Sequence, residues 1–272
     1  MRTVPVSVGA FSSRWAGKVA APHLSGTETL QRNLAQTGIV SPRAAAVAGI
    51  GNYARYWVDM LALPTIDLVE LDRRFSYLDY HHIREVQRGG QTPIMVLPHL
   101  GSWEWAAAWL GRVANQQVTA VVERLSDEAV FEWFVSTRSS YGVDVVPLGP
   151  SAMTELMAAA KDPNRIICLL TDRDISGNGV EVEFFGKRSS FPAGPALLSL
   201  RSGNPLLPVA IYDEGRTRRC QVLPPIWPQR LGRLRDDLLT TTQKVAEQLE
   251  VLIAAAPDQW HVLSPVWPGS DE

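Results

Sequence analysis

The chain has 272 residues, of which 46% are apolar, so it can bury a core as one large α/β domain or two small ones. Its 26 basic and 28 acidic side chains give a formal net charge of −2, which excludes the global positive field typical of nucleic-acid-binding proteins. With two cysteines, Cys168 and Cys220, the chain has no disulfide framework, which fits a reducing cytoplasm.

No run of 18 apolar residues occurs, and Ser12-Ser13-Arg14 interrupts the first apolar stretch. We therefore expect neither a membrane-spanning helix nor a signal peptide.

The first 90 residues are expected to be mainly helical. Residues 1–15 lack periodicity, and the first helices are predicted at 27–36 and 43–61, with Ser41 and Pro42 as N-cap and N1 of the second. Residues 66–73 fit either a strand or an extended linker. A short helix is predicted at 81–88, closed by Gly89-Gly90.

Strands and helices alternate along the rest of the chain. Strands are predicted at 94–98, 118–122, 143–147, 166–171, 206–212 and 219–223, and helices at 103–113, 127–140, 151–161, 192–202 and 234–256. This pattern predicts an α/β fold with a mixed, mostly parallel sheet flanked by helices. We expect one domain over residues 1–272, with a helical N-terminal region (1–90) and an α/β core (91–272).

A histidine and a glutamate lie where the strand at 94–98 turns into the next helix. The run reads His99-Leu-Gly-Ser-Trp-Glu104, and Glu104 falls in the first helical turn, where the helix dipole favours a carboxylate. The turn allows Glu104 to fold back onto His99, which would give a general base and the carboxylate that orients it. Taken singly, they would be an ordinary surface histidine and a capping charge.

Other polar side chains follow the neighbouring predicted strands. Asp172 follows the strand at 166–171, and Glu123 and Arg124 follow the strand at 118–122. The carboxyl ends of parallel strands share one sheet edge, where α/β proteins place ligands. Asp172 and Asp174 therefore compete with Glu104 as partners of His99. A pair of turn caps is the simpler interpretation of the two aspartates.

The run from His99 to Glu104 resembles the His-x4-Asp/Glu signature of glycerolipid and lipid A acyltransferases. The later blocks Asp172-Arg173-Asp174, Gly179 to Gly186 and Pro192 to Ala196 are similar to the lipid A lauroyl/myristoyl acyltransferase superfamily. Within it, the chain most resembles actinobacterial phosphatidylinositol mannoside acyltransferases, from about Arg32 to the block Pro257-Asp258-Gln259-Trp260. The resemblance implies a glycerolipid acyltransferase-like fold.

The resemblance also implies roles for particular residues. The catalytic set would be His99, Glu104 and Asp172, and the substrate-binding set would be Arg138, Arg173, Asp174, Glu181, Lys187 and Arg188. The segment from Glu181 to Gly186 resembles one that lines the acceptor and acyl groove. Lys187 and Arg188, with Arg201, could meet the phosphates of coenzyme A or of a lipid headgroup, although a surface charge cluster is equally consistent. A solvated helical arginine is the simpler interpretation of Arg138.

Backbone amides from Leu100 to Trp103 could stabilise the oxyanion of acyl transfer. No metal or other cofactor is expected, because His81-His82 has no third ligand at metal spacing in the sequence.

The implied function is transfer of a fatty acyl group from acyl-CoA or acyl carrier protein to a hydroxyl of a membrane glycolipid, preferably a phosphatidylinositol mannoside. The enzyme would act as a peripheral protein on the cytoplasmic face of the cell membrane, without nucleic-acid partners. Basic and aromatic residues of the N-terminal third predict a face for anionic lipid: Arg14, Trp15, Lys18, Arg32, Arg43 and Arg55.

Three other functions are weighed against this one. The acceptor could be another lipid or a secondary-metabolite alcohol. The second alternative is a catalytically inactive lipid-binding paralogue. The intact His99 and Glu104 argue against it, because a binding protein has no need of them. An α/β serine hydrolase would carry a Gly-x-Ser-x-Gly elbow, which Gly101-Ser102-Trp103 does not form.

Overall fold

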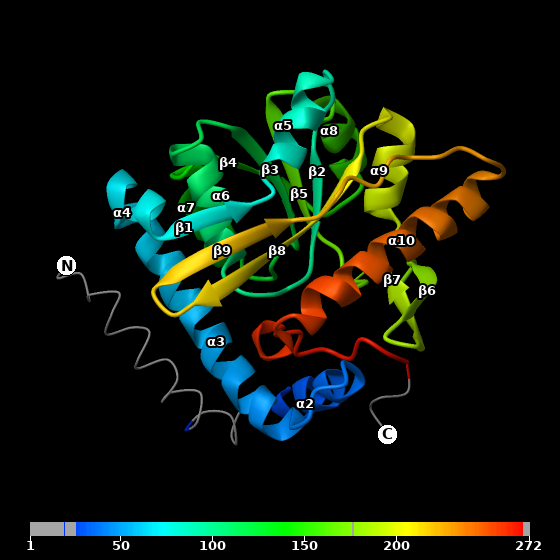
Figure 1. Cartoon of the computed structure of the whole chain (residues 1–272). Helices are drawn as coiled ribbons and strands as arrows, with labels where there is room; N and C mark the ends of the chain where they lie inside the picture. Colours follow the sequence, from blue (N-terminus) through cyan, green and yellow to red (C-terminus); the bar gives the residue numbers. More distant parts are fainter. Residues whose placement is uncertain (1–18, 20–25, 176, 269–272) are drawn as a thin grey trace.

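A seven-stranded sheet forms the centre of the molecule, in the order β1-β9-β8-β2-β5-β3-β4 (Figure 1). The computed structural model describes residue 19, residues 26–175 and residues 177–268. The expectations for residues 1–15 and for Lys18 therefore lie outside the described residues.

Most of this sheet is parallel. Five adjacent strands run in one direction: β8 (Leu206–Glu214), β2 (Ile94–Leu97), β5 (Arg165–Leu170), β3 (Gln117–Val122) and β4 (Val143–Pro147). β9 (Thr217–Val222) is antiparallel to β8, and β1 (Phe75–Leu78) pairs with β9 in parallel. The prediction of a mixed, mostly parallel sheet flanked by helices is confirmed.

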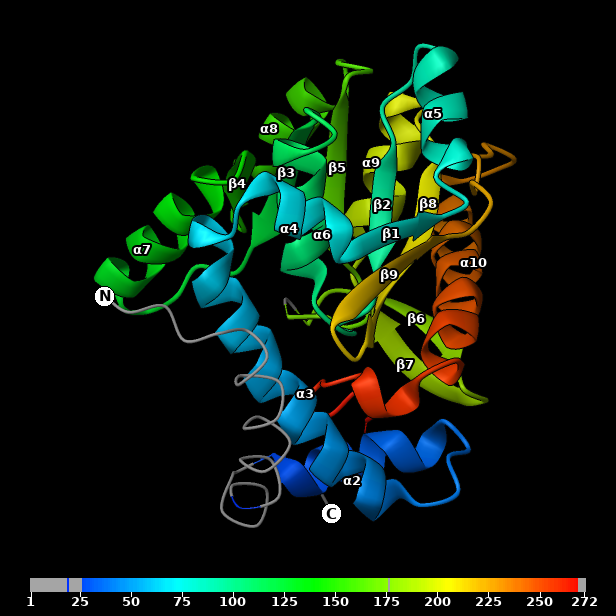
Figure 2. The same cartoon turned by 60° about the vertical axis from the view of Figure 1, so that its left-hand side comes forward.

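Helices cover both faces of the sheet (Figures 1 and 2). One face packs against α4 (Leu68–Arg73), α5 (His81–Arg88) and α6 (Trp103–Arg112), and the other against α8 (Ala152–Ala159), α9 (Gly194–Ser202) and α10 (Leu234–Ala254). Along β2, Ile94 and Val96 join one core while Met95 and Leu97 join the other. This alternation explains why all four residues of the strand are apolar and buried.

The N-terminal helices extend below the sheet in Figure 1. α2 (Thr27–Gln36) packs against α3 (Pro42–Ala62), and α3 also contacts the short helix η3 (Pro257–Gln259) near the C-terminus. Both helices lie where the sequence predicted them, at 27–36 and 43–61. None of the helices in the described parts of the chain is long and apolar enough to cross a membrane.

The interpretation of 66–73 as a strand or extended linker was wrong. Leu63–Thr65 forms the 3-10 helix η2, and Leu68–Arg73 forms α4. Asp67 caps α4, because its side chain accepts a hydrogen bond from the Glu70 N–H at 2.8 Å. The strand of this region comes later, as β1.

A separate hairpin joins β6 (Val180–Phe184) to β7 (Lys187–Phe191) (Figure 1). Val182 and Phe184 are buried while the intervening acidic residues are exposed, as the alternating sequence predicts. The hairpin is fastened to α10, since Gln243 and Glu250 accept hydrogen bonds from backbone N–H groups of the hairpin at 2.8 and 2.6 Å. α7 (Glu128–Ser139) packs beside β4 at the opposite end of the sheet.

Candidate active site

His99 lies two residues beyond the end of β2, and Gly101 then turns the chain into α6. Gly101 has a φ of +64°, and a Cβ at this position would lie 1.9 Å from the carbonyl oxygen of Ile211. Only glycine fits this turn, because it accepts the positive φ and has no Cβ to clash. The turn leaves the His99 side chain 21% exposed at the carboxyl edge of the sheet.

Asp172 is the carboxylate that meets His99. Leu97 of β2 pairs with Leu170 of β5, so His99 and Asp172 each lie two residues beyond this paired position. The His99 Nδ1 atom lies 2.6 Å from Asp172 Oδ1, and the His99 backbone N–H donates to Asp172 Oδ2 at 2.7 Å. Because an ionised carboxylate only accepts hydrogen bonds, Nδ1 carries the proton and Nε2 is left as the basic atom.

Asp172 is buried yet ionised. Burial raises the pKa of Asp172, but the electrostatic interaction with His99 and hydrogen bonds from the His99 ring, the Trp260 indole and the His99 backbone outweigh it, so the pKa lies below its usual value. The negative carboxylate therefore fixes both the tautomer and the orientation of the imidazole.

Glu104 does not orient His99, and this part of the sequence prediction was wrong. Its Oε1 accepts hydrogen bonds from Arg138 Nη2 at 2.5 Å and from the Tyr56 hydroxyl at 3.0 Å. Its Oε2 accepts the Tyr141 hydroxyl at 2.6 Å. The first turn of α6 directs this carboxylate towards α3 and α7 rather than back across the turn.

An aromatic stack lies between these two carboxylate clusters. The Trp103 ring lies 4.3 Å from that of Tyr56 and 5.2 Å from that of His261, measured between ring centroids. Its edge also faces His99, with the centroids 5.6 Å apart. Trp103 thus forms a wall beside the imidazole.

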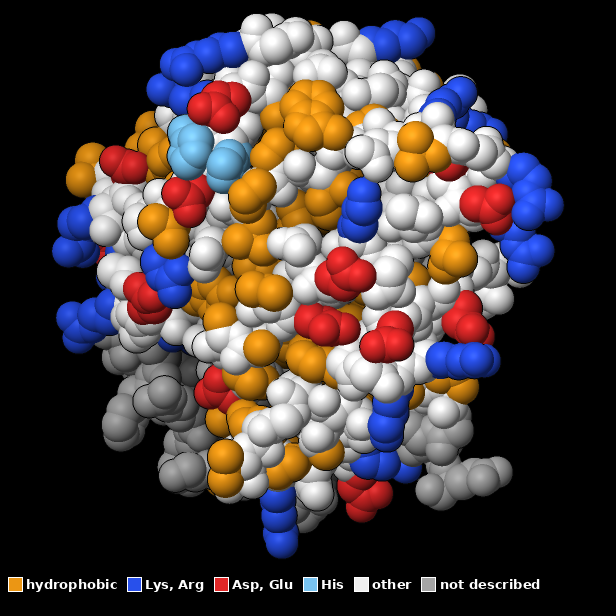
Figure 3. All heavy atoms as spheres, turned by 45° about the vertical axis from the view of Figure 1, so that its right-hand side comes forward, with side chains coloured by type: hydrophobic (Ala, Val, Ile, Leu, Met, Phe, Trp, Pro, Cys, Tyr) orange, Lys and Arg blue, Asp and Glu red, His pale blue; other side chains and the backbone are white. Residues whose placement is uncertain are grey.

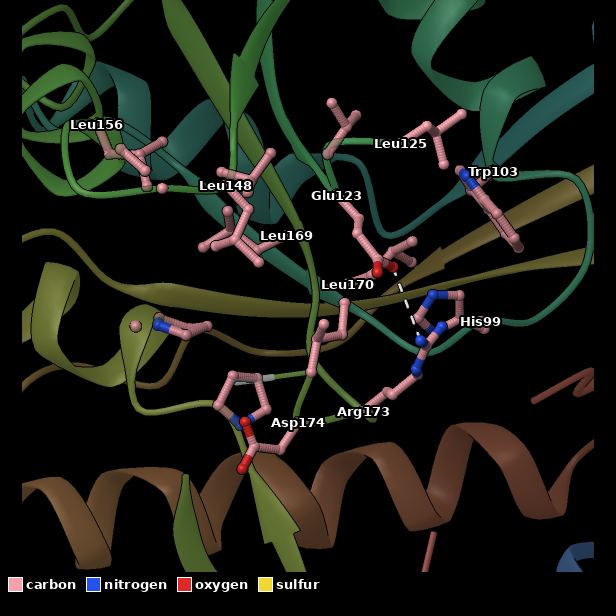
Figure 4. Close-up of a pocket in the computed structure, with 18 of the residues that line it drawn as sticks. His99, Trp103, Glu123, Leu125, Leu148, Leu156, Leu169, Leu170, Arg173 and Asp174 are labelled. Carbon is pink, nitrogen blue, oxygen red and sulfur yellow. Dashed lines mark ion pairs between the residues drawn. The ribbon is translucent and has the colours of Figure 1, made fainter. Parts of the chain in front are cut away.

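A pocket of about 510 Å³ opens in front of His99 (Figure 4). The carboxyl ends of β3 and β5 and residues from α3, α7, α8 and the start of α9 form its wall. Most of this wall is apolar, including Trp103, Leu125, Leu148, Leu156, Leu169 and Leu170. The start of α9 also lines it, through Gly194 and Pro195.

Three of the predicted substrate-binding residues line this pocket: Arg138, Arg173 and Asp174. Arg138 is held by Glu104. Arg173 forms an ion pair with Glu123 at 3.6 Å, marked in Figure 4. Asp174 shapes the following loop, since it accepts hydrogen bonds from the Gly179 N–H and the Ser190 hydroxyl, each at 2.8 Å.

The other three predicted substrate-binding residues do not line the pocket. Glu181, Lys187 and Arg188 are exposed on the β6–β7 hairpin, where Glu181 and Arg188 lie 3.6 Å apart. The hairpin packs on α10, away from this pocket. A role of the three residues in substrate binding stays a prediction.

Backbone amides near the turn were predicted to form an oxyanion hole. The Leu100 N–H donates to the Pro98 carbonyl at 2.8 Å, and the Gly101 N–H donates to the Gln259 carbonyl at 3.1 Å. These two amides are already used within the fold. The amides of Ser102 and Trp103, at the start of α6, are the remaining candidates.

Sequence reasoning assigned no role to Trp260. This side chain is fully buried, and its indole N–H donates to Asp172 Oδ2 at 2.7 Å. Trp260 belongs to the block Pro257 to Trp260 that carries the family resemblance, but no sequence pattern links position 260 to position 172.

His81 and His82 do have a third candidate metal ligand. Glu85 lies one helical turn away, and the possible ligand atoms of the three residues are within 4.8 Å of one another. Figure 3 shows two neighbouring histidine side chains flanked by acidic ones on the surface. The expectation that a third ligand is lacking was wrong. That the reaction needs no metal stays a prediction.

A half-buried histidine, paired with a buried aspartate at the mouth of an apolar pocket, is suited to proton transfer beside a long apolar substrate. Residues 1–268 match the family described as bacterial lipid A biosynthesis acyltransferase, and the chain belongs to this family. It is thus an acyltransferase of the lipid A type.

Two similar proteins are both named phosphatidylinositol mannoside acyltransferase. The chain is 36% identical to the phosphatidylinositol mannoside acyltransferase of Mycolicibacterium smegmatis, over 93% of the chain and 83% of that protein. It is also 36% identical to the enzyme of the same name from Mycobacterium tuberculosis, over 89% of the chain and 77% of that protein. Among solved structures, a 1-acyl-sn-glycerophosphate acyltransferase from Thermotoga maritima matches with a TM-score of 0.42 and 16% identity, over 92% of this chain and 95% of that one.

Proposed function

We propose that the enzyme transfers a fatty acyl group from a thioester of coenzyme A or acyl carrier protein to a hydroxyl of a phosphatidylinositol mannoside. The observation that carries this proposal is the His99–Asp172 pair beside the apolar pocket. The two phosphatidylinositol mannoside acyltransferases, each 36% identical, favour this acceptor over other lipid alcohols.

The proposed reaction begins at His99 Nε2. This atom takes the proton of the acceptor hydroxyl as its oxygen attacks the thioester carbonyl carbon. Asp172 holds Nδ1–H in place and stabilises the imidazolium that forms. When the tetrahedral intermediate collapses, the carbon–sulfur bond breaks, and the imidazolium returns its proton to the leaving thiolate. The products are an ester and a free thiol.

The pocket would hold the acyl chain of the donor. Its apolar wall removes methylene groups from water, which stabilises binding by about 0.8 kcal/mol for each buried methylene. Arg173 is suited to a phosphate of the donor or of the lipid headgroup, because its side chain is 37% exposed and its ion pair with Glu123 spans 3.6 Å. An exposed pair of this length contributes little and can rearrange.

The enzyme would work as a peripheral protein on the cytoplasmic face of the cell membrane. Leu125, Leu148 and Ile175 line the pocket and are still 37%, 45% and 44% exposed, so its mouth offers an apolar rim to lipid. The basic face proposed from the sequence is smaller than expected. Arg55 is directed inward to Asp59, with an 11% exposed side chain, while Arg32 and Arg43 line an open groove between α2 and α3.

The decisive experiment combines purified enzyme, radiolabelled palmitoyl-CoA or palmitoyl carrier protein, and a panel of lipid extracts that includes phosphatidylinositol dimannoside. We expect an acylated mannoside, identified by mass spectrometry, that the His99→Ala variant does not form. Absence of any acylated product with either donor would favour the inactive lipid-binding paralogue. Acylation of a different alcohol would replace the proposed acceptor.

A further inference from the structure

The segment from Gln259 to His261 runs antiparallel to the turn that carries His99. The Gly101 N–H donates to the Gln259 carbonyl at 3.1 Å, and the His261 N–H donates to the His99 carbonyl at 3.0 Å. Leu100 and Trp260 form an antiparallel bridge between these two hydrogen bonds. A segment about 160 positions away in the sequence therefore forms the backing of the catalytic turn.

Other parts of the fold hold this backing segment in place. Asn33 of α2 donates to the carbonyls of Val262 and Ser264, and Asn52 of α3 donates to the carbonyl of Asp258, all at 2.8 to 2.9 Å. The chain here passes between the N-terminal helices and the end of the sheet (Figures 1 and 2). The two N-terminal helices thus fix the segment in place.

The Trp260 indole completes the hydrogen bonding of Asp172. Oδ1 faces the His99 ring, while Oδ2 accepts both the His99 N–H and the Trp260 Nε1–H. Asp172 is 1% exposed, so bulk water has little access to its carboxylate. Losing a hydrogen-bond donor there therefore costs free energy. Without the indole N–H, Oδ2 would keep the backbone donor alone, and the carboxylate would be less firmly held.

We infer that Trp260 is a positioning residue, whose indole N–H keeps the Asp172 carboxylate aligned with the His99 ring. This inference rests on the proposed function, in which His99 is the general base. Other charged and titratable groups also surround the pair: His261 on the backing segment, Glu123 after β3, and Arg173 and Asp174 after β5. They are the same in every variant compared below, so a change in pH dependence reports the indole.

The test compares Trp260→Phe with Trp267→Phe. Trp267 is a matched control, because it is 5% exposed, packs in the same core, and donates its indole N–H to the Phe184 carbonyl at 3.0 Å. The measurements are kcat, KM and the pH profile for acylation of phosphatidylinositol dimannoside by palmitoyl-CoA, with thermal unfolding of each variant.

For Trp260→Phe we expect kcat to fall about tenfold, with KM for palmitoyl-CoA unchanged, since the indole contacts the carboxylate and not the pocket. We expect the acid limb of the profile to move up by about one pH unit, because His99 and Asp172 titrate as a coupled pair and losing a donor to the carboxylate favours the protonated form of the pair. Trp267→Phe should keep the wild-type profile. In an Asp172→Ala background, Trp260→Phe should cause no further loss of kcat.

If Trp260→Phe does not fold, benzothienylalanine at position 260 retains the ring size and removes only the N–H. A wild-type kcat and acid limb in the folded variant would overturn the inference, as would equal shifts in the two tryptophan variants. Failure of the proposed function is distinguishable, because the wild-type enzyme would then form no acylated dimannoside, whereas failure of this inference alone leaves wild-type turnover, and its loss in His99→Ala, intact.

Discussion

Two buried carboxylates lie near the start of α6, and they have different partners. Asp172 meets the imidazole of His99, while Glu104 meets the guanidinium of Arg138 and the hydroxyls of Tyr56 and Tyr141. Both are almost inaccessible to water, at 1% and 3% exposure. What separates them is the partner's ability to exchange a proton.

Imidazole gains and loses a proton in the physiological range, whereas a guanidinium stays charged. In the Glu104 cluster, burial first and then the carboxylate raise the pKa values of Tyr56 and Tyr141, so these hydroxyls keep their protons. We therefore expect proton transfer at the Asp172 cluster and a structural function for the Glu104 cluster.

The largest effect is expected from His99→Ala. This substitution removes the group that takes the hydroxyl proton, and loss of a general base lowers the rate by about 10² to 10⁴. The half-buried position of His99 should allow the variant to fold, which circular dichroism can verify. Near-normal acylation by the folded variant would place proton transfer elsewhere.

Asp172→Asn and Glu104→Gln test the comparison directly. Asp172→Asn should lower kcat by about 10² or more, because a neutral amide neither fixes the Nδ1 proton nor stabilises the imidazolium. Glu104→Gln should lower kcat much less, since Glu104 has no contact with the imidazole. Steady-state kinetics at one pH suffice, and a larger loss in Glu104→Gln than in Asp172→Asn would contradict the assignment.

The main effect of Glu104→Gln should instead be on the stability of the fold. Glu104→Gln leaves the Arg138 guanidinium partly buried without its counter-charge, which typically costs about 3 kcal/mol. Denaturant unfolding of the Glu104→Gln variant measures this cost. The exposed ion pair between Arg124 and Glu128 serves as the reference. Removing the exposed pair by Glu128→Gln should change stability by less than about 1 kcal/mol.

The sequence predicted the α/β core well because its strands are short apolar runs that alternate with longer helical segments. The helix at 27–36 and the position of His99 after a buried strand are as expected. The error at 66–73 arose because the cap at Asp67, which starts α4, was overlooked. Asp172 remained an open alternative, since its contact with His99 requires β2 and β5 to be neighbours, and strand order is not written in local patterns. Trp260 was missed for the same reason.

His261 extends the comparison to acid stability. Burial, followed by the nearby charge of His99, lowers the pKa of His261 to about 3. Between pH 6.5 and pH 3 the unfolded chain therefore binds a proton that the folded chain does not, so stability falls as the pH decreases through this window. The cost by pH 5 is about 2 kcal/mol, from 1.5 pH units at 1.36 kcal/mol each.

His261→Phe should flatten this acid dependence, because phenylalanine can still stack on Trp103 but has no proton to gain. Urea unfolding at pH 7.5 and pH 5 gives the difference. His81→Gln is the control, since the His81 side chain is 57% exposed and should leave the pH dependence unchanged. An acid dependence as steep in His261→Phe as in the wild type would assign it to other groups.

The smallest expected effect concerns the membrane and compares two equally exposed tryptophans. Trp133 on α7, beside the pocket, is 44% exposed, and Trp227, near α10, is 46% exposed. If the pocket mouth docks on lipid, Trp133→Ser should weaken binding to vesicles several-fold, while Trp227→Ser should not.

Binding to anionic vesicles should exceed binding to neutral ones and decrease with salt, because Arg32 and Arg43 contribute about 1 kcal/mol each near anionic lipid. Basic and acidic side chains are mixed on the face in Figure 3, so that face offers no continuous basic surface. Vesicle sedimentation measures both contributions. Equal pelleting with anionic and neutral vesicles at low salt would exclude binding through basic side chains. Equal losses of binding in the two tryptophan variants would exclude docking through the pocket mouth.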